Sequence, residues 1–236
     1  MPEHSHSPDA IAARIGAPPG RGVLRDVVYG GIDGSVTTFA IVAGVAGAGL
    51  SPFIIVALGL ANVLADGFSM AAGNYSGTKA ELDNIRRLRV VEERHIARYP
   101  EGERLEVREI LAQKGLSGDV LDQATDAITA NRENWVALMI EGEYGLGSID
   151  PHPMRAALAT FAAFLVAGMI PLLPFLFGMA EAFTVSAWMT GAVFFAIGTM
   201  KSFWSLAPWW RSGLETLVIG GAAALIAYGV GLLFHA

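Results

Sequence analysis

The chain has 236 residues, of which 53% are hydrophobic and 16% are charged, and its formal net charge is −6. Because a typical soluble domain has about 25% charged residues, this composition indicates a membrane protein, and the negative charge argues against binding of nucleic acid. Cysteine is absent, which excludes disulfides, iron–sulfur clusters and cysteine nucleophiles, so a bound metal would need oxygen, nitrogen or thioether ligands.

The N-terminal segment contains proline, histidine and serine but no apolar core. It therefore matches neither a signal peptide nor a membrane span. We predict that residues 1–24 form a disordered cytoplasmic tail.

Five later segments are long and apolar enough to cross a bilayer, which requires about 20 residues per helix. Helices are expected because lipid cannot satisfy free backbone groups and the alternation of barrel strands is missing. The spans are predicted at residues 27–50, 52–75, 154–177, 182–204 and 213–234.

Lysine and arginine define the orientation of these spans, because they favour cytoplasmic loops. In a five-span arrangement every Lys and Arg falls on one side of the membrane, including Arg25, Arg155, Lys201 and Arg211. We therefore predict that the N-terminus and the insertion are cytoplasmic and that the C-terminus is external. The simplest location is a bacterial inner membrane.

The charged stretch between spans two and three is predicted to be helical. Span two is expected to continue to about residue 97, where Tyr99, Pro100 and Gly102 break the helix. A second helix fits residues 103–114, and a third fits residues 118–145, where apolar residues recur at helical spacing.

The predicted fold class is all-α, a polytopic membrane protein with five transmembrane helices and a cytoplasmic three-helix insertion. Residues 25–76 carry spans one and two. Residues 77–150 form the cytoplasmic helical domain, and residues 151–236 carry spans three to five.

Acidic residues of the insertion recur at spacings of three and four, which places them on common helix faces. Carboxylates with one imidazole suit Fe²⁺ or Mn²⁺, and a thioether favours softer transition metals. The alternative is a solvated helix surface with ordinary ion pairs, because Glu and Arg alternate here. The candidate ligands are Glu92, His95, Glu103, Glu106, Glu109, Met139 and Glu143.

Ionisable residues also occur inside the predicted spans, where they are costly and often functional. Asp33 lies in the first span, and Asn62, Asp66 and Met70 recur every four residues in the second. These side chains could form a path for a metal ion, and the carboxylates could exchange protons. The alternative is that Asp33 is hydrated near the membrane surface and that Asp66 pairs with neighbouring polar groups.

Several of these motifs together resemble the vacuolar iron transporter family. The resemblance extends from about Arg25 to the C-terminus. Its motifs are Asp33-Gly34, Ser69-Met70 with Gly73 and Tyr75, and Trp135, Met139 and Glu143 followed by Gly145-Leu146-Gly147.

The resemblance implies a dimer with five spans per subunit, an ion path at the interface and a cytoplasmic three-helix metal-binding domain. It also implies export of cytosolic Fe²⁺, and in some members Mn²⁺, in exchange for protons. Asp33 and Met70 match path residues of the family. Matching ligands of the cytoplasmic domain are Glu92, Glu103, Glu106, Met139 and Glu143.

Three positions depart from the family pattern. Asn62 stands where plant members have a glutamate of the path, His95 replaces a ligand glutamate, and Ile140 replaces a second methionine. These differences leave the principal metal and the proton coupling open, and Asp66 is the candidate to act in place of the missing glutamate.

We therefore expect a metal/proton antiporter, not an enzyme, without a permanently bound cofactor. Its partners would be divalent ions (Fe²⁺, Mn²⁺, Zn²⁺ or Co²⁺), protons, the lipid bilayer and a second copy of the chain. The alternatives are a membrane-bound ferroxidase and a metal-binding sensor that does not transport.

Overall fold

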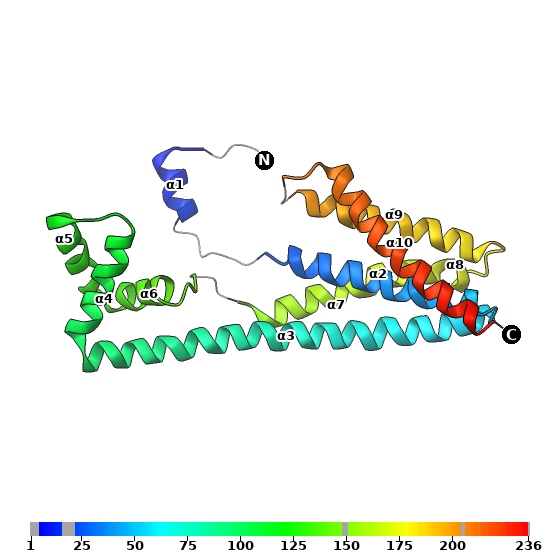
Figure 1. Ribbon diagram of the computed structural model, residues 1–236, viewed down its shortest axis with the longest axis horizontal. Coiled ribbons are helices and arrows are strands. Elements are labelled where there is room, and N and C mark those ends of the chain that lie inside the picture. Colours follow the sequence, from blue (N-terminus) through cyan, green and yellow to red (C-terminus); the bar gives the residue numbers. More distant parts are fainter. Residues whose placement is uncertain (1–4, 16–21, 148–150, 204–205, 236) are drawn as a thin grey trace. The chain divides into compact units, whose positions relative to one another are not determined.

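The computed structural model describes residues 5–15, 22–147, 151–203 and 206–235, in which all regular secondary structure is helical (Figure 1). Residues 1–4, 16–21, 148–150, 204–205 and 236 lie outside the described residues, so the predicted tail, the insertion and the segment with the last three spans are described without them. The chain divides into two compact units. One contains Met1–Arg21 and Thr78–His152, and the other contains Gly22–Gly77 and Pro153–Ala236.

Among the described residues, five helices are long and apolar enough to cross a membrane, which confirms the predicted all-α class with five membrane helices. The third of these spans is interrupted, because Pro171 lacks the backbone N–H that a regular helix needs, and residues Ile170–Leu172 form a 3₁₀ turn. The spans comprise α2 (Leu24–Gly47), α3 (Pro52–Arg98), α7 (Pro153–Met169) continued by α8 (Leu173–Leu176), α9 (Ala182–Ser202) and α10 (Trp209–Leu233).

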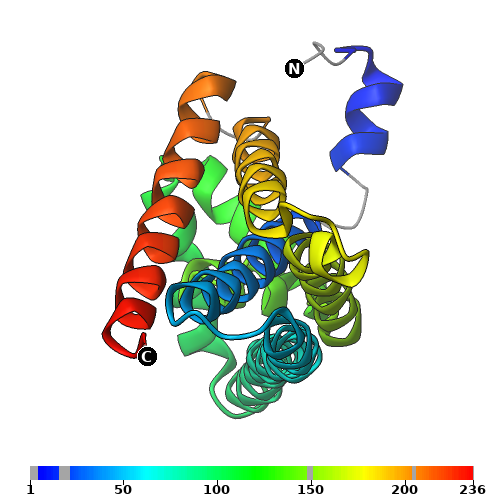
Figure 2. The same cartoon turned by 90° about the vertical axis from the view of Figure 1, so that its right-hand side faces the viewer.

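Helix α2 occupies the centre of the membrane unit, where it contacts α7, α9 and α10 (Figure 2). Its buried side chains Phe39, Val42 and Val45 form an apolar core with Val63 of α3 and Leu172 of the 3₁₀ turn. The helix that carries Asp33 is therefore held by neighbours on several sides.

Glycines allow α2 to approach its neighbours at backbone distance. A Cβ atom on Gly34 would lie 2.5 Å from the carbonyl oxygen of Phe164 in α7. A Cβ on Gly47 would lie 2.5 Å from the carbonyl oxygen of Tyr228 in α10. Small residues at such positions let membrane helices approach closely, which replaces the hydrophobic drive that lipid does not provide.

Replacing Gly34 with alanine should therefore destabilise the membrane unit. The new methyl group meets backbone atoms that cannot move aside, so we expect a loss of about 1–3 kcal/mol, seen as a lower unfolding temperature in detergent. Gly221→Ala is the control, because no atom lies within 4 Å of a Cβ there. Equal unfolding temperatures for the two variants would contradict this account of the α2–α7 contact.

The second unit contains the predicted insertion, and α3 continues as predicted beyond its apolar part to Arg98. Three further helices follow, and their apolar faces enclose a core that includes Ile96, Val107, Leu111 and Val136. These helices are α4 (Pro100–Gln113), α5 (Gly118–Thr129) and α6 (Arg132–Gly142).

The structure differs from the predictions at two places in this unit. The single helix predicted at residues 118–145 is divided into α5 and α6, because the Asn131 side chain accepts hydrogen bonds from the backbone N–H groups of Glu133 and Asn134 and caps a new helix. Within the predicted disordered tail, Pro8–Ile15 forms the short helix α1. Proline in the first turn and the acidic Asp9 favour this helix start.

Candidate metal-binding sites

A cluster of two carboxylates and one imidazole forms where α3 meets α4. Pro100 starts α4 directly after α3 ends, so the chain reverses and Glu103 returns beside Glu92 and His95. One ligand atom from each of the three side chains lies within 4.8 Å of the others. The Nδ1 atom of His95 is 3.6 Å from Oε1 of Glu103. We call these three residues the acidic cluster.

The two carboxylates of the acidic cluster are buried and incompletely paired. Glu92 is 0% exposed and Glu103 is 6% exposed, and the Oε2 atom of each has no hydrogen-bond partner. The hydroxyl of Tyr144 donates to Oε1 of Glu92 at 2.9 Å. Buried charged oxygens without partners are costly, and a coordinated cation would satisfy them.

The electrostatics of the cluster also favour a cation. Burial, together with the negative charges of Glu106 and Glu92, raises the pKa of Glu103 to about 7, although His95 opposes the shift. Burial and the charge of Glu92 likewise raise the pKa of Glu143. Such shifts mark an excess of negative charge that a divalent ion would relieve.

The other predicted ligands take different places. Glu106 and Glu143 are exposed, although their charges act on the acidic cluster. Glu109 is also exposed and accepts a hydrogen bond from Gln113 within its own helix. Met139 is fully buried in the apolar core of this unit, beside Trp135.

Tyr144 is a residue of the site that the sequence analysis did not select. Its only sequence signal is its position next to Glu143, because its contact with Glu92 joins residues 52 positions apart. The hydrogen bond and the nearby charge of Glu92 keep the Tyr144 hydroxyl protonated, since burial raises its pKa first and these interactions raise it further. Tyr144 thus orients the buried carboxylate.

Replacing Tyr144 with phenylalanine should destabilise the metal-free protein by about 1–3 kcal/mol, because Glu92 loses the partner of a buried, charged hydrogen bond. The measurement is thermal unfolding of the full chain in detergent with a chelator present. Tyr99→Phe is the matched control, because Tyr99 is 58% exposed. A loss no larger than that of the control would rule out this role.

The membrane unit contains a second candidate site. Asp33 of α2 and Met70 of α3 line one cavity of about 550 Å³, which Lys201 of α9 also lines. A carboxylate oxygen and a thioether sulfur in one cavity are ligands that suit transition metals such as Fe²⁺. We call this the Asp33 cavity.

The predicted stripe of Asn62, Asp66 and Met70 does not line one cavity. The Asn62 amide lies 3.3 Å from the Thr37 hydroxyl and 3.5 Å from the Thr38 hydroxyl, to which it donates, and so it connects α3 to α2. Asp66 is exposed on the surface of the unit, although its charge acts on Asp33. Of the three, only Met70 lines the Asp33 cavity.

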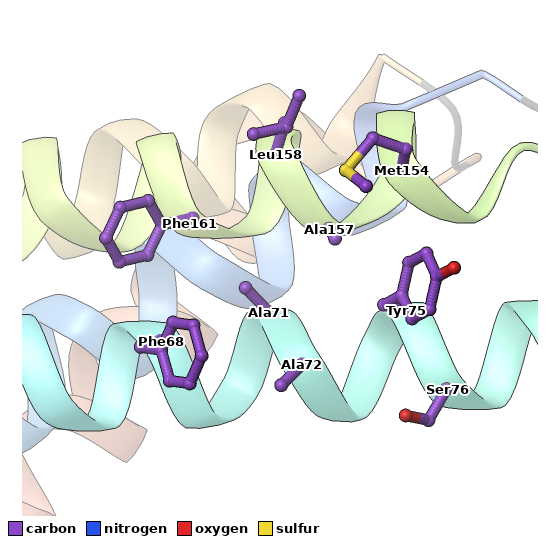
Figure 3. Close-up of a pocket in the computed structure, with 9 residues that line it drawn as sticks. All are labelled: Phe68, Ala71, Ala72, Tyr75, Ser76, Met154, Ala157, Leu158 and Phe161. Carbon is purple, nitrogen blue, oxygen red and sulfur yellow. The ribbon is translucent and has the colours of Figure 1, made fainter.

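A second cavity, of about 330 Å³, lies between α3 and α7 (Figure 3). Aromatic and aliphatic side chains such as Phe68, Leu158 and Phe161 form its walls, with the Tyr75 ring near one end. Among the described residues that line it, none carries a carboxylate, an imidazole or an amide. Its polar side chains are the Tyr75 phenol, the Ser76 hydroxyl and the Met154 thioether, so it lacks a charged group that would compensate a divalent ion.

The fold defines a helical integral membrane protein, and each of its two units has side chains of types that could bind a metal ion. A model of the VIT family matches residues 24–232, and the chain belongs to this family.

Relatives with curated names cover most of the chain. Vacuolar iron transporter 1 of Arabidopsis thaliana is 33% identical over 209 residues, which span 87% of this chain and 84% of that protein. The vacuolar iron transporter of Centaurea cyanus is 34% identical over 211 residues, 88% of this chain and 86% of its own. The vacuolar iron transporter of Toxoplasma gondii is 34% identical over 224 residues, 90% of this chain and 74% of its own.

Proposed function

We propose that this protein transports Fe²⁺, and also accepts Mn²⁺, out of the cytoplasm in exchange for protons. The observation that carries the proposal is the Asp33 cavity, in which a carboxylate and a thioether from two membrane helices line one space. The three relatives are named vacuolar iron transporters, which supports iron as the cargo.

The acidic cluster captures the ion before it enters the membrane. Glu92 and Glu103 provide buried carboxylate oxygens and His95 provides an imidazole nitrogen, a set that binds Fe²⁺, Mn²⁺, Co²⁺ or Zn²⁺. The ion is cargo, and no permanently bound cofactor takes part. Glu106 and Glu143 add negative charge around the cluster and raise the local concentration of cations.

Protons return through the carboxylates of the membrane unit. The charge of Asp66 acts on Asp33, so the pair of negative charges favours a bound cation or proton at Asp33. Asp66 takes the role for which Asn62 is unsuited, because an amide cannot titrate.

A second copy of the chain completes the membrane site. Asp66 is exposed on an otherwise apolar segment, and a carboxylate facing lipid is costly. Covering this face with the same face of another subunit removes the charge from lipid and places two sets of carboxylates along one path. The protein would therefore act as a homodimer.

The basic residues support the orientation. Arg25 and Arg211 lie near the starts of α2 and α10, Arg155 lies near the start of α7, and Lys201 lies near the end of α9. These helix ends lie on the same side of the membrane unit in Figure 1. By the positive-inside rule this side faces the cytoplasm. The same rule places the insertion, which is rich in Lys and Arg, in the cytoplasm, and the location would be a bacterial inner membrane.

The test is Fe²⁺ uptake into proteoliposomes under anaerobic conditions, with the pH gradient imposed in either direction or absent. Flux that follows the pH gradient supports the antiporter, and flux that ignores it would remove the proton coupling. A protein that binds Fe²⁺ without flux would be a sensor. Consumption of Fe²⁺ with O₂ would indicate a ferroxidase, although di-iron centres usually use paired Glu-x-x-His motifs and the acidic cluster has one histidine.

A further inference from the structure

A positively charged side chain lines the Asp33 cavity together with the proposed ligands. Lys201, from the last turn of α9, contributes to the same walls as Asp33 and Met70. Its Nζ atom is 3.1 Å from Oε2 of Glu215 in α10. The described residues that line this cavity include one carboxylate, that of Asp33, and one ammonium group, that of Lys201. The ammonium group forms its ion pair with Glu215, which is not a lining residue.

Transport raises a charge problem at Asp33 once the metal ion has left. An unpaired carboxylate within a membrane helix is costly, and the other carboxylate that acts on it, Asp66, adds repulsion. A cation must therefore replace the metal, either a proton, as in the proposed exchange, or a positively charged side chain. The ammonium group of Lys201 is the cation that this chain itself supplies at the cavity.

We propose that Lys201 is a tethered cation that competes with the metal ion for Asp33. While Glu215 holds the ammonium group, Asp33 and Met70 are free to bind the divalent ion. When the ammonium group leaves Glu215 and approaches Asp33, it neutralises the carboxylate and displaces the metal. The inference rests on the proposed function and adds a residue that sets the affinity of its membrane site.

The role of Glu215 follows from its surroundings. Its side chain is 60% exposed, so its carboxylate can be hydrated when the ammonium departs, whereas Asp33 is partly buried. After the exchange the unpaired negative charge is on Glu215, where water solvates it better than it would solvate Asp33. A side chain with a flexible four-carbon stem and a compact charge suits this movement, because it can pair with either acid.

Single and double substitutions separate this role from a structural ion pair. Lys201→Met removes the competitor, so the KM for Fe²⁺ in proteoliposomes should fall about tenfold. Glu215→Gln frees the ammonium for Asp33, so the KM should rise about tenfold. The double variant Lys201→Met/Glu215→Gln should keep the lowered KM of Lys201→Met, because Glu215 acts on the site only through Lys201.

A binding measurement makes the test independent of flux. In full-length protein carrying Glu92→Gln and Glu103→Gln, Fe²⁺ added under anaerobic conditions should raise the unfolding temperature through the membrane site alone. Lys201→Met should enlarge this rise at a given Fe²⁺ concentration, and Glu215→Gln should reduce it.

The outcomes distinguish the two proposals. Absence of Fe²⁺ flux from the unaltered protein would overturn the proposed function, and the binding measurement would still decide the role of Lys201. Flux in the unaltered protein, with the same KM and the same Fe²⁺-induced stabilisation in all Lys201 and Glu215 variants, would overturn the tethered cation. Both single variants shifting KM in the same direction would also overturn it, because this is the pattern of a purely structural ion pair.

Discussion

Substitution of Asp33 by asparagine should abolish Fe²⁺ flux, lowering it by about a hundredfold or more. Among the described residues that line the Asp33 cavity, Asp33 supplies the only carboxylate. An asparagine of nearly equal size removes the negative charge that compensates the ion, and binding at such a site depends on that charge. The rate of Fe²⁺ uptake into proteoliposomes, normalised to the amount of folded protein, measures the effect.

The control for this substitution is Asp83→Asn, which removes one carboxylate from an exposed ion pair with Lys79. This variant should transport at close to the original rate, because exposed ion pairs contribute little to stability. Fe²⁺ binding to the acidic cluster should persist in the Asp33 variant. Transport by the Asp33→Asn protein within a fewfold of the original would exclude the cavity as the ion path.

Substitution of Glu103 by glutamine should weaken Fe²⁺ binding to the acidic cluster by about a hundredfold or more. Loss of a residue that only supports a ligand lowers metal affinity by about 10–100-fold, and loss of the ligand itself should exceed this range. Titration of the full chain in detergent, carrying Asp33→Asn to silence the membrane site, measures the change. Glu101→Gln, an exposed position on the same helix, is the control and should bind as before.

The same residue gives binding a pH dependence. The pKa of Glu103 is about 7 in the folded protein against an ordinary value of 4.5, so below pH 7 a metal ion must displace its proton. Affinity should rise about tenfold per pH unit up to about pH 7 and then level off. The protonated carboxyl stabilises the metal-free fold fully below pH 4.5, and this contribution is lost as the pH rises to about 7.

Fe²⁺ affinity measured as a function of pH, for the original protein and for Glu103→Gln, checks this prediction. The rise in affinity up to about pH 7 should disappear in Glu103→Gln, because glutamine does not titrate. An unchanged slope in the variant would assign the proton to another member of the cluster.

The membrane spans follow from composition alone, because a run of about 20 apolar residues has few alternatives to a spanning helix. The helix boundaries within the insertion are less predictable. The apolar spacing from Leu121 to Leu138 continues through the turn at Ala130 and Asn131, so periodicity alone gives one helix. The break depends on a local cap by Asn131, which competes with helix continuation through its side chain.

The candidate ligands show that a spacing of three residues does not keep a series of side chains on one helix face. Steps of three residues turn a helix by about 300°, so Glu106 is rotated about 60° and Glu109 about 120° from Glu103. The structure accordingly buries Glu103 and exposes the other two. The sequence analysis selected all three members of the acidic cluster. The contacts of Tyr144 with Glu92 and of Lys201 with Glu215 depend on the tertiary arrangement, which one sequence does not encode as a pattern.

The close backbone contacts of α2 restrict how the protein can change conformation. With Gly34 against the main chain of α7 and Gly47 against that of α10, this helix has no clearance in which to slide or rotate on its own. In the proposed transporter, α2, α7 and α10 would then move together, because packed helices shear only by small amounts. Asp33 then serves as a stationary point, and access to it changes through movement of the remaining helices around it.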